Sequence, residues 1–203
     1  MAQFAIIKDK DGFTNVRLEP ESSAKVIYKL KSNEVFAYAQ EDYYYNIDWI
    51  QVWISKNQFS IDCGGLGRLS GYIHRSRIQP FNKLKAYIEN NLTFELKTIS
   101  FDENNHVIDY TNGYVIAING LHPWGADGKI PRTVVDRIII KIDDQDIKIP
   151  KFLFADLFEC NTDYIAYKNE DTYFIYQKFG LGIESQIVIW VIDKYGLRQR
   201  YLA

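Results

Sequence analysis

The stretch Gly71-Tyr72-Ile73-His74-Arg75-Ser76-Arg77-Ile78 decides the fold of this chain. Its first half alternates like a half-buried strand, His74-Arg75-Ser76 indicates a turn, and the strand resumes at Ile78. We interpret the stretch as the closing strand of a small β-barrel that opens near residues 11–17. Short strand-like segments, separated by turn residues roughly every 8–12 positions, lie between the two and are typical of an all-β barrel.

Composition also favours β-structure. The chain has 203 residues, of which 47% are hydrophobic, 25% charged and 15% aromatic, so it can bury a real core. Its 15 Tyr and 12 Phe suit the pleated, half-buried surface of a sheet. A net charge of -2 argues against a general nucleic-acid binder, which needs a basic face. We expect no nucleic acid among its partners.

No segment predicts a membrane span or a secretory leader. No window approaches the roughly 20 apolar residues that a spanning helix needs. The first eight residues lack the basic start and long apolar run of a signal peptide. We expect a cytoplasmic protein without membrane partners, and leave open a processed leader.

Cysteine and histidine spacing predicts neither a metal site nor a cofactor. Cys63 and Cys160 are far apart and are expected to be free thiols. His74, His106 and His122 have no His or Cys partner at zinc-binding spacing. The acidic segments 9–12 and 143–146 are expected to be turns rather than cation sites.

The strand pattern predicts two modules, residues 3–80 and residues 81–203, which meet at Pro80-Phe81-Asn82. The fold class is all-β: a barrel, then a second antiparallel β domain with one short helix, placed after Pro150. Residues 41–48 are expected to form a loop. Residues 107–110 are expected to pair with 92–101, the clearest strand. Residues 15–20 are expected to form an extended arm that ends at Pro20. The expected strands are 4–8, 25–30, 34–39, 49–54, 71–78, 92–101, 107–110, 114–118, 134–143, 146–149, 164–168, 172–179, 185–192 and 197–202.

The first module resembles the bacterial Src-homology-3-like (SH3-like) domain. The resemblance covers about residues 3 to 80, and departs from the family at an insertion over 56–69. It rests on the order and spacing of these short patterns: Asp11-Gly12, Asn15-Val16-Arg17, Pro20, Val26, Leu30, Glu34-Val35, Trp49-Ile50-Gln51-Val52, Gly71-Tyr72-Ile73-His74 and Ser76-Arg77-Ile78.

The second module looks like a β-rich domain of unknown function that follows SH3-like modules in bacterial proteins. Proteins of this kind occur beside toxin and immunity genes, which implies a protein partner. The residues that carry this resemblance are Trp124-Gly125-Ala126-Asp127-Gly128, Pro131, Ile147-Lys148-Ile149-Pro150, Leu157 and Ile189-Trp190-Val191-Ile192.

One motif resembles the active-site motif of an enzyme family. Ile61-Asp62-Cys63-Gly64 is similar to the Asp-Cys-Ser-Gly signature of cell-wall cysteine peptidases, and His106 follows downstream. That chemistry needs a thiolate, which a helix starting after the cysteine would stabilise. The glycines after Cys63 make a poor helix. We therefore expect a thiol in a loop, and a protein that is not an enzyme.

Two surfaces are candidates for partner binding. The first combines Tyr43-Tyr44-Tyr45 with Trp49 and Tyr72, because aromatic residues near the loops of such barrels line a groove for extended peptides. The alternative places Trp49 and Tyr72 in the core, which we favour for Trp49, while the tyrosine run shields a loop. The second is loop 119–131, with Trp124 and Asp127. Here we favour the alternative in which Trp124 fills the second core and Asp127 caps the loop.

The expected function is protein binding without catalysis, and an immunity protein that occludes a bacterial toxin is the most specific form of it. Two alternatives stay open: a cell-envelope module that binds peptidoglycan peptide, and an enzyme with a site the sequence does not reveal.

Overall fold

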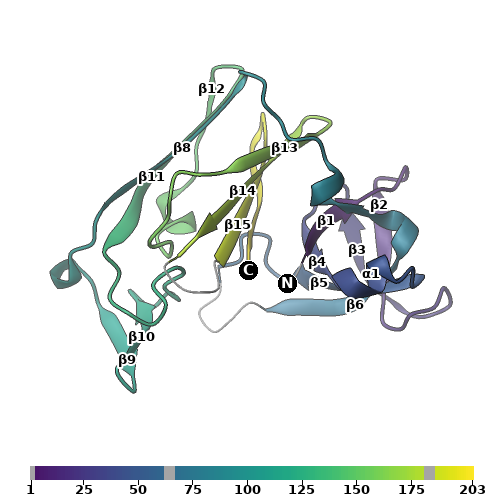
Figure 1. Ribbon diagram of the computed structural model, residues 1–203, viewed down its shortest axis with the longest axis horizontal. Helices are drawn as coiled ribbons and strands as arrows, with labels where there is room; N and C mark the ends of the chain where they lie inside the picture. The colour runs from purple at the N-terminus through teal and green to yellow at the C-terminus, as the bar shows by residue number, and fades with distance from the viewer. Residues whose placement is uncertain (1–2, 62–66, 181–185) are drawn as a thin grey trace.

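The computed structural model describes residues 3–61, 67–180 and 186–203 (Figure 1). Its strands form antiparallel sheets, and the described residues contain one α-helix, which is five residues long. The predicted all-β class is confirmed. No helix in these ranges is long and apolar enough to cross a membrane.

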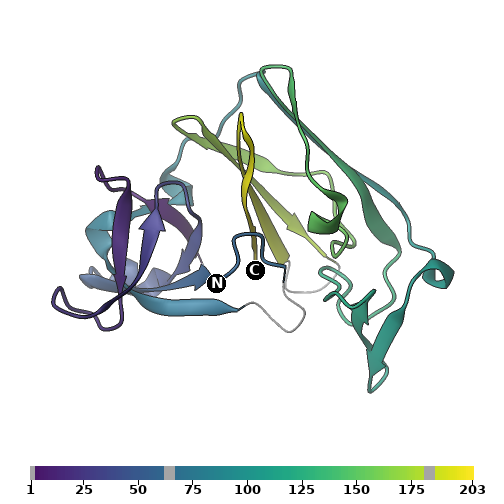
Figure 2. The ribbon, with the colours of Figure 1, turned by 180° about the vertical axis from the view of Figure 1, so that it is seen from behind.

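The first seven strands form one antiparallel sheet that curls around its own core (Figure 2). Inward-facing residues such as Val16, Ile50 and Ile73 fill that core. The sheet order is β3-β2-β6-β5-β4-β1-β7. The strands are β1 (Gln3–Ile7), β2 (Phe13–Arg17), β3 (Val26–Lys31), β4 (Phe36–Tyr38), β5 (Trp49–Ser55), β6 (Arg68–His74) and β7 (Ile78–Pro80).

The stretch 71–78 folds as the sequence predicts, as a strand, a turn and a strand. β6 ends at His74, a single 3-10 turn covers Arg75–Arg77, and β7 begins at Ile78. The imidazole Nδ1 of His74 accepts a hydrogen bond from the backbone N–H of Ser76 (3.3 Å), which holds this corner. Gly71 is required because a Cβ there would lie 2.8 Å from the carbonyl oxygen of Arg17 on β2.

Three local predictions were wrong. The expected loop 41–48 begins with helix α1 (Gln40–Tyr44), whose first turn carries acidic residues that favour a helix N-terminus. The expected helix after Pro150 is one 3-10 turn (Lys151–Leu153), because bridges of Leu157 to Trp124 and Phe158 to Val134 use the backbone that a longer helix would need. Residues 107–110 do not pair with 92–101.

The described residues of the second half form three sheets. β8 (Leu92–Ser100) pairs along its length with β11 (Thr133–Ile142), which also pairs with β12 (Gln145–Ile147). β9 (Ile108–Thr111) and β10 (Tyr114–Ile118) form a separate hairpin. The last sheet has the order β13-β14-β15-β16, from β13 (Ile165–Asn169), β14 (Thr172–Phe179), β15 (Gln186–Asp193) and β16 (Gly196–Leu202).

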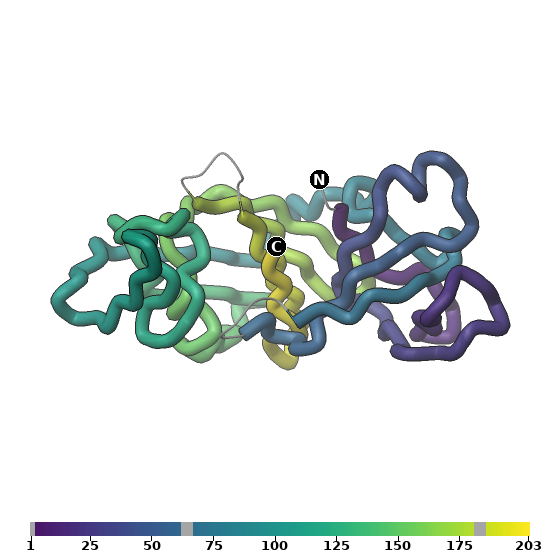
Figure 3. Tube along the Cα trace, turned by 90° about the horizontal axis from the view of Figure 1, so that it is seen from below, coloured from purple at the N-terminus to yellow at the C-terminus, as the bar shows by residue number. Residues whose placement is uncertain are grey.

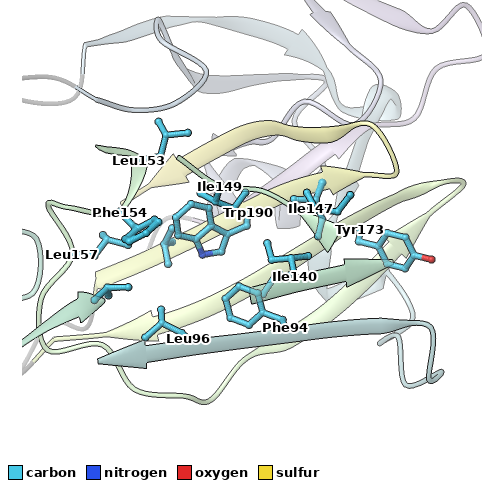
Figure 4. Close-up of a cluster of buried hydrophobic side chains, with 14 of the residues drawn as sticks. Phe94, Leu96, Ile140, Ile147, Ile149, Leu153, Phe154, Leu157, Tyr173 and Trp190 are labelled. Atoms are coloured by element: carbon cyan, nitrogen blue, oxygen red, sulfur yellow. The ribbon is translucent and has the colours of Figure 1, made fainter. Parts of the chain in front are cut away.

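The four-stranded sheet β13–β16 is the centre of the molecule, with apolar residues on both faces. Trp190 and Val188 pack towards β8 and β11, against residues such as Phe94 and Leu96 (Figure 4). Ile189 and Val191, next to them in sequence, pack towards the barrel together with Phe4, Phe81 and Tyr201. Seen from below, the barrel lies at one end of an elongated molecule and the β9–β10 hairpin at the other (Figure 3). The domain division near residue 80 stays a prediction.

Candidate functional site

The end of helix α1 and the residue after it carry the most exposed tyrosines of the predicted sites. Tyr44 is 57% exposed and Tyr45 79%, and Ile47 beyond them is 45% exposed. The helix ends because Asn46 adopts a left-handed conformation (φ 60°), which asparagine tolerates well. We call Tyr43, Tyr44, Tyr45 and Ile47 the tyrosine patch.

Tyr43 fixes this patch to the barrel. Its ring packs edge-on against buried Tyr38, with 5.5 Å between ring centroids. The Lys83 ammonium lies 5.3 Å from the Tyr43 ring and the Arg75 guanidinium 5.6 Å from it, as cation–π contacts. Burial, with smaller effects from Tyr44 and Tyr43, raises the pKa of Tyr38 to about 12. Two neighbouring tyrosines are thus displayed on an anchored support.

Trp49 and Tyr72 lie on the outer faces of β5 and β6, not in the barrel core. β5 alternates so that Ile50, Val52 and Ile54 point inward and Trp49 outward. The Trp49 ring meets His74 edge-on at 5.7 Å. Tyr72 lies opposite Gln51 across the β5–β6 pair. Both aromatics are half-buried, so the core position that we favoured for Trp49 was wrong.

Loop 119–131 is anchored by Trp124. Its side chain packs against the core between the three-stranded sheet β12-β11-β8 and the four-stranded sheet β13–β16. Its backbone N–H donates to the carbonyl of Asp156 (2.9 Å), and its carbonyl accepts from the N–H of Phe158 (2.8 Å). Trp124 is partly buried and packs at the border of the second core, which agrees only in part with the alternative that we favoured. Asp127 is exposed at a left-handed position (φ 51°) of the same loop, facing solvent.

Behind this loop lies a buried ion pair that the sequence did not reveal. One guanidinium nitrogen of Arg200, Nη2, contacts both carboxylate oxygens of Asp156, at 2.7 and 2.8 Å. Arg200 is fully buried and Asp156 is 4% exposed. The sequence of β16 does not alternate in a way that would predict this burial. Gln199 and Arg200 are both buried, each towards a different layer.

Two further titratable groups lie within electrostatic range of this pair. Burial raises the pKa of the Cys160 thiol far above its usual value, although the Arg200 charge opposes the shift. Burial lowers the pKa of His122, against the opposing charge of Asp156. A thiol held in its protonated form is a weak nucleophile. The Arg200–Asp156 pair ties β16 to the segment that carries Asp156.

The peptidase-like motif is only partly within the described residues. Cys63 lies outside the described residues. The His106 Nδ1 accepts a hydrogen bond of 2.8 Å from the Asn119 Nδ2, and the His106 ring stacks on Phe101 at 4.6 Å. Among the described residues, no group of three or more His, Cys, Asp or Glu side chains could hold a metal ion.

A groove of about 320 Å³ lies between the barrel and the four-stranded sheet. Its acidic side chains are already engaged. Glu34 accepts a hydrogen bond from the Tyr28 hydroxyl (2.7 Å), and Asp193 pairs with Arg198 (2.7 Å). The groove is therefore a polar seam between two layers.

No known protein family, curated protein or solved structure matches this chain.

Proposed function

We propose that this protein binds a protein partner through the tyrosine patch and does no chemistry there. The observation that carries the proposal is the pair Tyr44 and Tyr45, which are 57% and 79% exposed at the end of a helix whose other tyrosine, Tyr43, is anchored. Tyrosine provides large contact area with little loss of side-chain entropy, so it is enriched where binding energy concentrates.

The surroundings of the patch suit a recognition surface. Ile47 extends the exposed apolar area beyond the helix. Arg75 and Lys83 hold the Tyr43 ring from the barrel side, which limits the ordering that binding would need. Trp49 lies on β5 just after Ile47, half-buried against His74, and can form the border of the contact.

The test compares the wild type with a Tyr44→Ala/Tyr45→Ala variant in quantitative pull-downs from the native host. We expect the variant to lose a specific partner, and its affinity for that purified partner to fall about tenfold or more. The matched control is Tyr195→Ala, since Tyr195 is 75% exposed in the distant β15–β16 turn. Retention of every partner by the double variant would reject the patch as the binding site.

The more specific proposal, an immunity protein, names a bacterial toxin as that partner. It predicts co-purification with the product of a neighbouring toxin gene and loss of toxin inhibition in the double variant. If a neighbouring toxin neither binds this protein nor is inhibited by it, the immunity role is rejected. The pull-down would then still decide whether the tyrosine patch binds another partner.

A further inference from the structure

Two edge strands of the second half are covered by other parts of the chain. On β16, the backbone N–H of Arg200 donates to the carbonyl of Gln58 (2.8 Å). On β13, the carbonyl of Ala166 accepts from the N–H of Tyr87 (2.8 Å). Within the described ranges, the backbone of β8 bonds on one side only, to β11. No described residue pairs with its other edge along the nine residues of the strand.

The open edge of β8 is a regular row of donors and acceptors. On the covered side, Phe101 N–H donates to Arg132 and the Asn91 carbonyl accepts from Asp143. The register shift in this pair lies in β11, so β8 itself alternates without interruption. The backbone N–H and C=O groups of odd-numbered residues therefore point towards β11. Those of the even-numbered residues from Leu92 to Ser100 point towards the open edge. Such a row, without proline or bulge, is a template for another strand.

We propose that a second copy of this chain pairs there, β8 against β8, antiparallel about a two-fold axis at Leu96. Leu96 is the midpoint of Leu92–Ser100, so this register uses the whole strand. Because the Leu96 N–H and carbonyl face outward, the two Leu96 residues exchange a pair of hydrogen bonds. The three-stranded sheet becomes continuous with its copy across the interface.

Charge selects this register. Glu95 and Lys97 flank Leu96 on the solvent face, where their side chains are 52% and 51% exposed. The two-fold axis places Glu95 of each copy directly opposite Lys97 of the other, in the non-hydrogen-bonded pairs where side chains come closest. A shift of the register by two residues would set Glu95 against Glu95 or Lys97 against Lys97.

The single chain also places two like charges side by side, each already next to an acid: the Lys97 ammonium lies 3.6 Å from Glu95 and the Arg137 guanidinium 3.3 Å from Asp136. Lys97 lies directly opposite Arg137 in the β8–β11 register. Like charges facing each other across strands are destabilising. In the proposed dimer, Glu95 of the second copy lies beside Lys97 on the side away from Arg137, so that Lys97 lies between Arg137 and an acid. The interface would also bring Ile99, which is 53% exposed, opposite Thr93 of the second copy.

The test measures mass against concentration by light scattering or sedimentation on the full chain. We expect a concentration-dependent dimer of the 23.8-kDa wild type. Glu95→Lys puts lysine opposite lysine, Lys97→Glu puts glutamate opposite glutamate, and each should weaken the dimer about tenfold or more. Mixing the two single variants should restore a heterodimer, because both cross-strand pairs are then opposite in charge.

Glu103→Lys and Lys129→Glu are the controls, since they make the same charge changes at exposed positions away from β8 and should dimerise like wild type. Thr98→Pro removes an outward N–H without touching β11 and should give a monomer with the wild-type circular dichroism spectrum. A wild type that stays monomeric, or single charge variants that dimerise as well as the controls, would overturn the proposal. If Thr98→Pro does not fold, the charge variants and their mixture still decide it.

Discussion

Gly125 shows how a single residue sets the path of the second half. It adopts φ 94°, and a Cβ there would lie 2.1 Å from the carbonyl oxygen of Phe158. Trp124 beside it makes the backbone bonds that join loop 119–131 to residues 156–158. The glycine is needed both for its backbone angle and for the close approach of the two segments.

Gly125→Ala should therefore lower the free energy of unfolding by about 3 kcal/mol or more, from backbone strain and the steric clash together. Gly120→Ala is the matched control, because Gly120 also has a positive φ (76°) but open space around its Cβ position. It should lose only about 1 kcal/mol. Urea denaturation measures both, and equal losses would show that the approach to Phe158 is not what requires glycine.

At the scale of elements, β16 is fixed from both of its faces. Arg200 reaches Asp156 on one side, with its guanidinium 5.8 Å from the Trp190 ring. Gln199 reaches the barrel on the other. The segment after Pro150 stops after one 3-10 turn because neighbouring strands use its backbone, which propensity within a few residues does not specify.

Arg200→Met should cost about 3–5 kcal/mol of unfolding free energy, because it leaves the Asp156 carboxylate buried without its partner. Arg198→Met is the control two residues away, since its pair with Asp193 is half-exposed on the arginine side and should cost about 1 kcal/mol or less. Chemical denaturation of both variants gives the comparison. A loss for Arg200→Met no larger than that for the control would contradict a structural role for the buried pair.

At the scale of the whole molecule, the four-stranded sheet connects two layers that the sequence suggests are separate modules. The Gln199 side chain mimics a strand, because its Oε1 accepts from the N–H of Val35 (2.7 Å) and its Nε2 donates to the Val35 carbonyl (3.0 Å). Asn33 adds hydrogen bonds to Thr172 and Asn169. Phe4 and Phe81 complete the contact with an apolar cluster.

Gln199→Leu should lower the unfolding free energy by about 2–4 kcal/mol, since both buried backbone groups of Val35 lose their partners. Gln145→Leu is the control, because Gln145 is exposed and its side chain makes one long bond of 3.4 Å to Lys194. Thermal and urea unfolding of the two variants measure this difference in unfolding free energy. If Gln199→Leu proved as stable as the control, the barrel and the sheet would not depend on this link.

The sequence by itself determined the all-β class and the position of nearly every strand, because alternation and turn residues are local signals. The segment 71–78 is the clearest case, with its strand, turn and strand in the expected places. It also identified Trp124 as the side chain that packs an irregular loop against the second core. It could not specify partners between distant segments, so β8 was assigned to the nearer strand 107–110 when it pairs with β11.

The tertiary structure alone decided which faces are buried. It placed Trp49 outside the barrel core, because inward positions of β5 were taken by Ile50, Val52 and Ile54. It buried Gln199 and Arg200 in consecutive positions of β16, because the four-stranded sheet has a layer on each side. It also left β8 with an open edge, which depends on where the rest of the chain passes. Burial and edge pairing are sums over distant contacts, and no local pattern contains them.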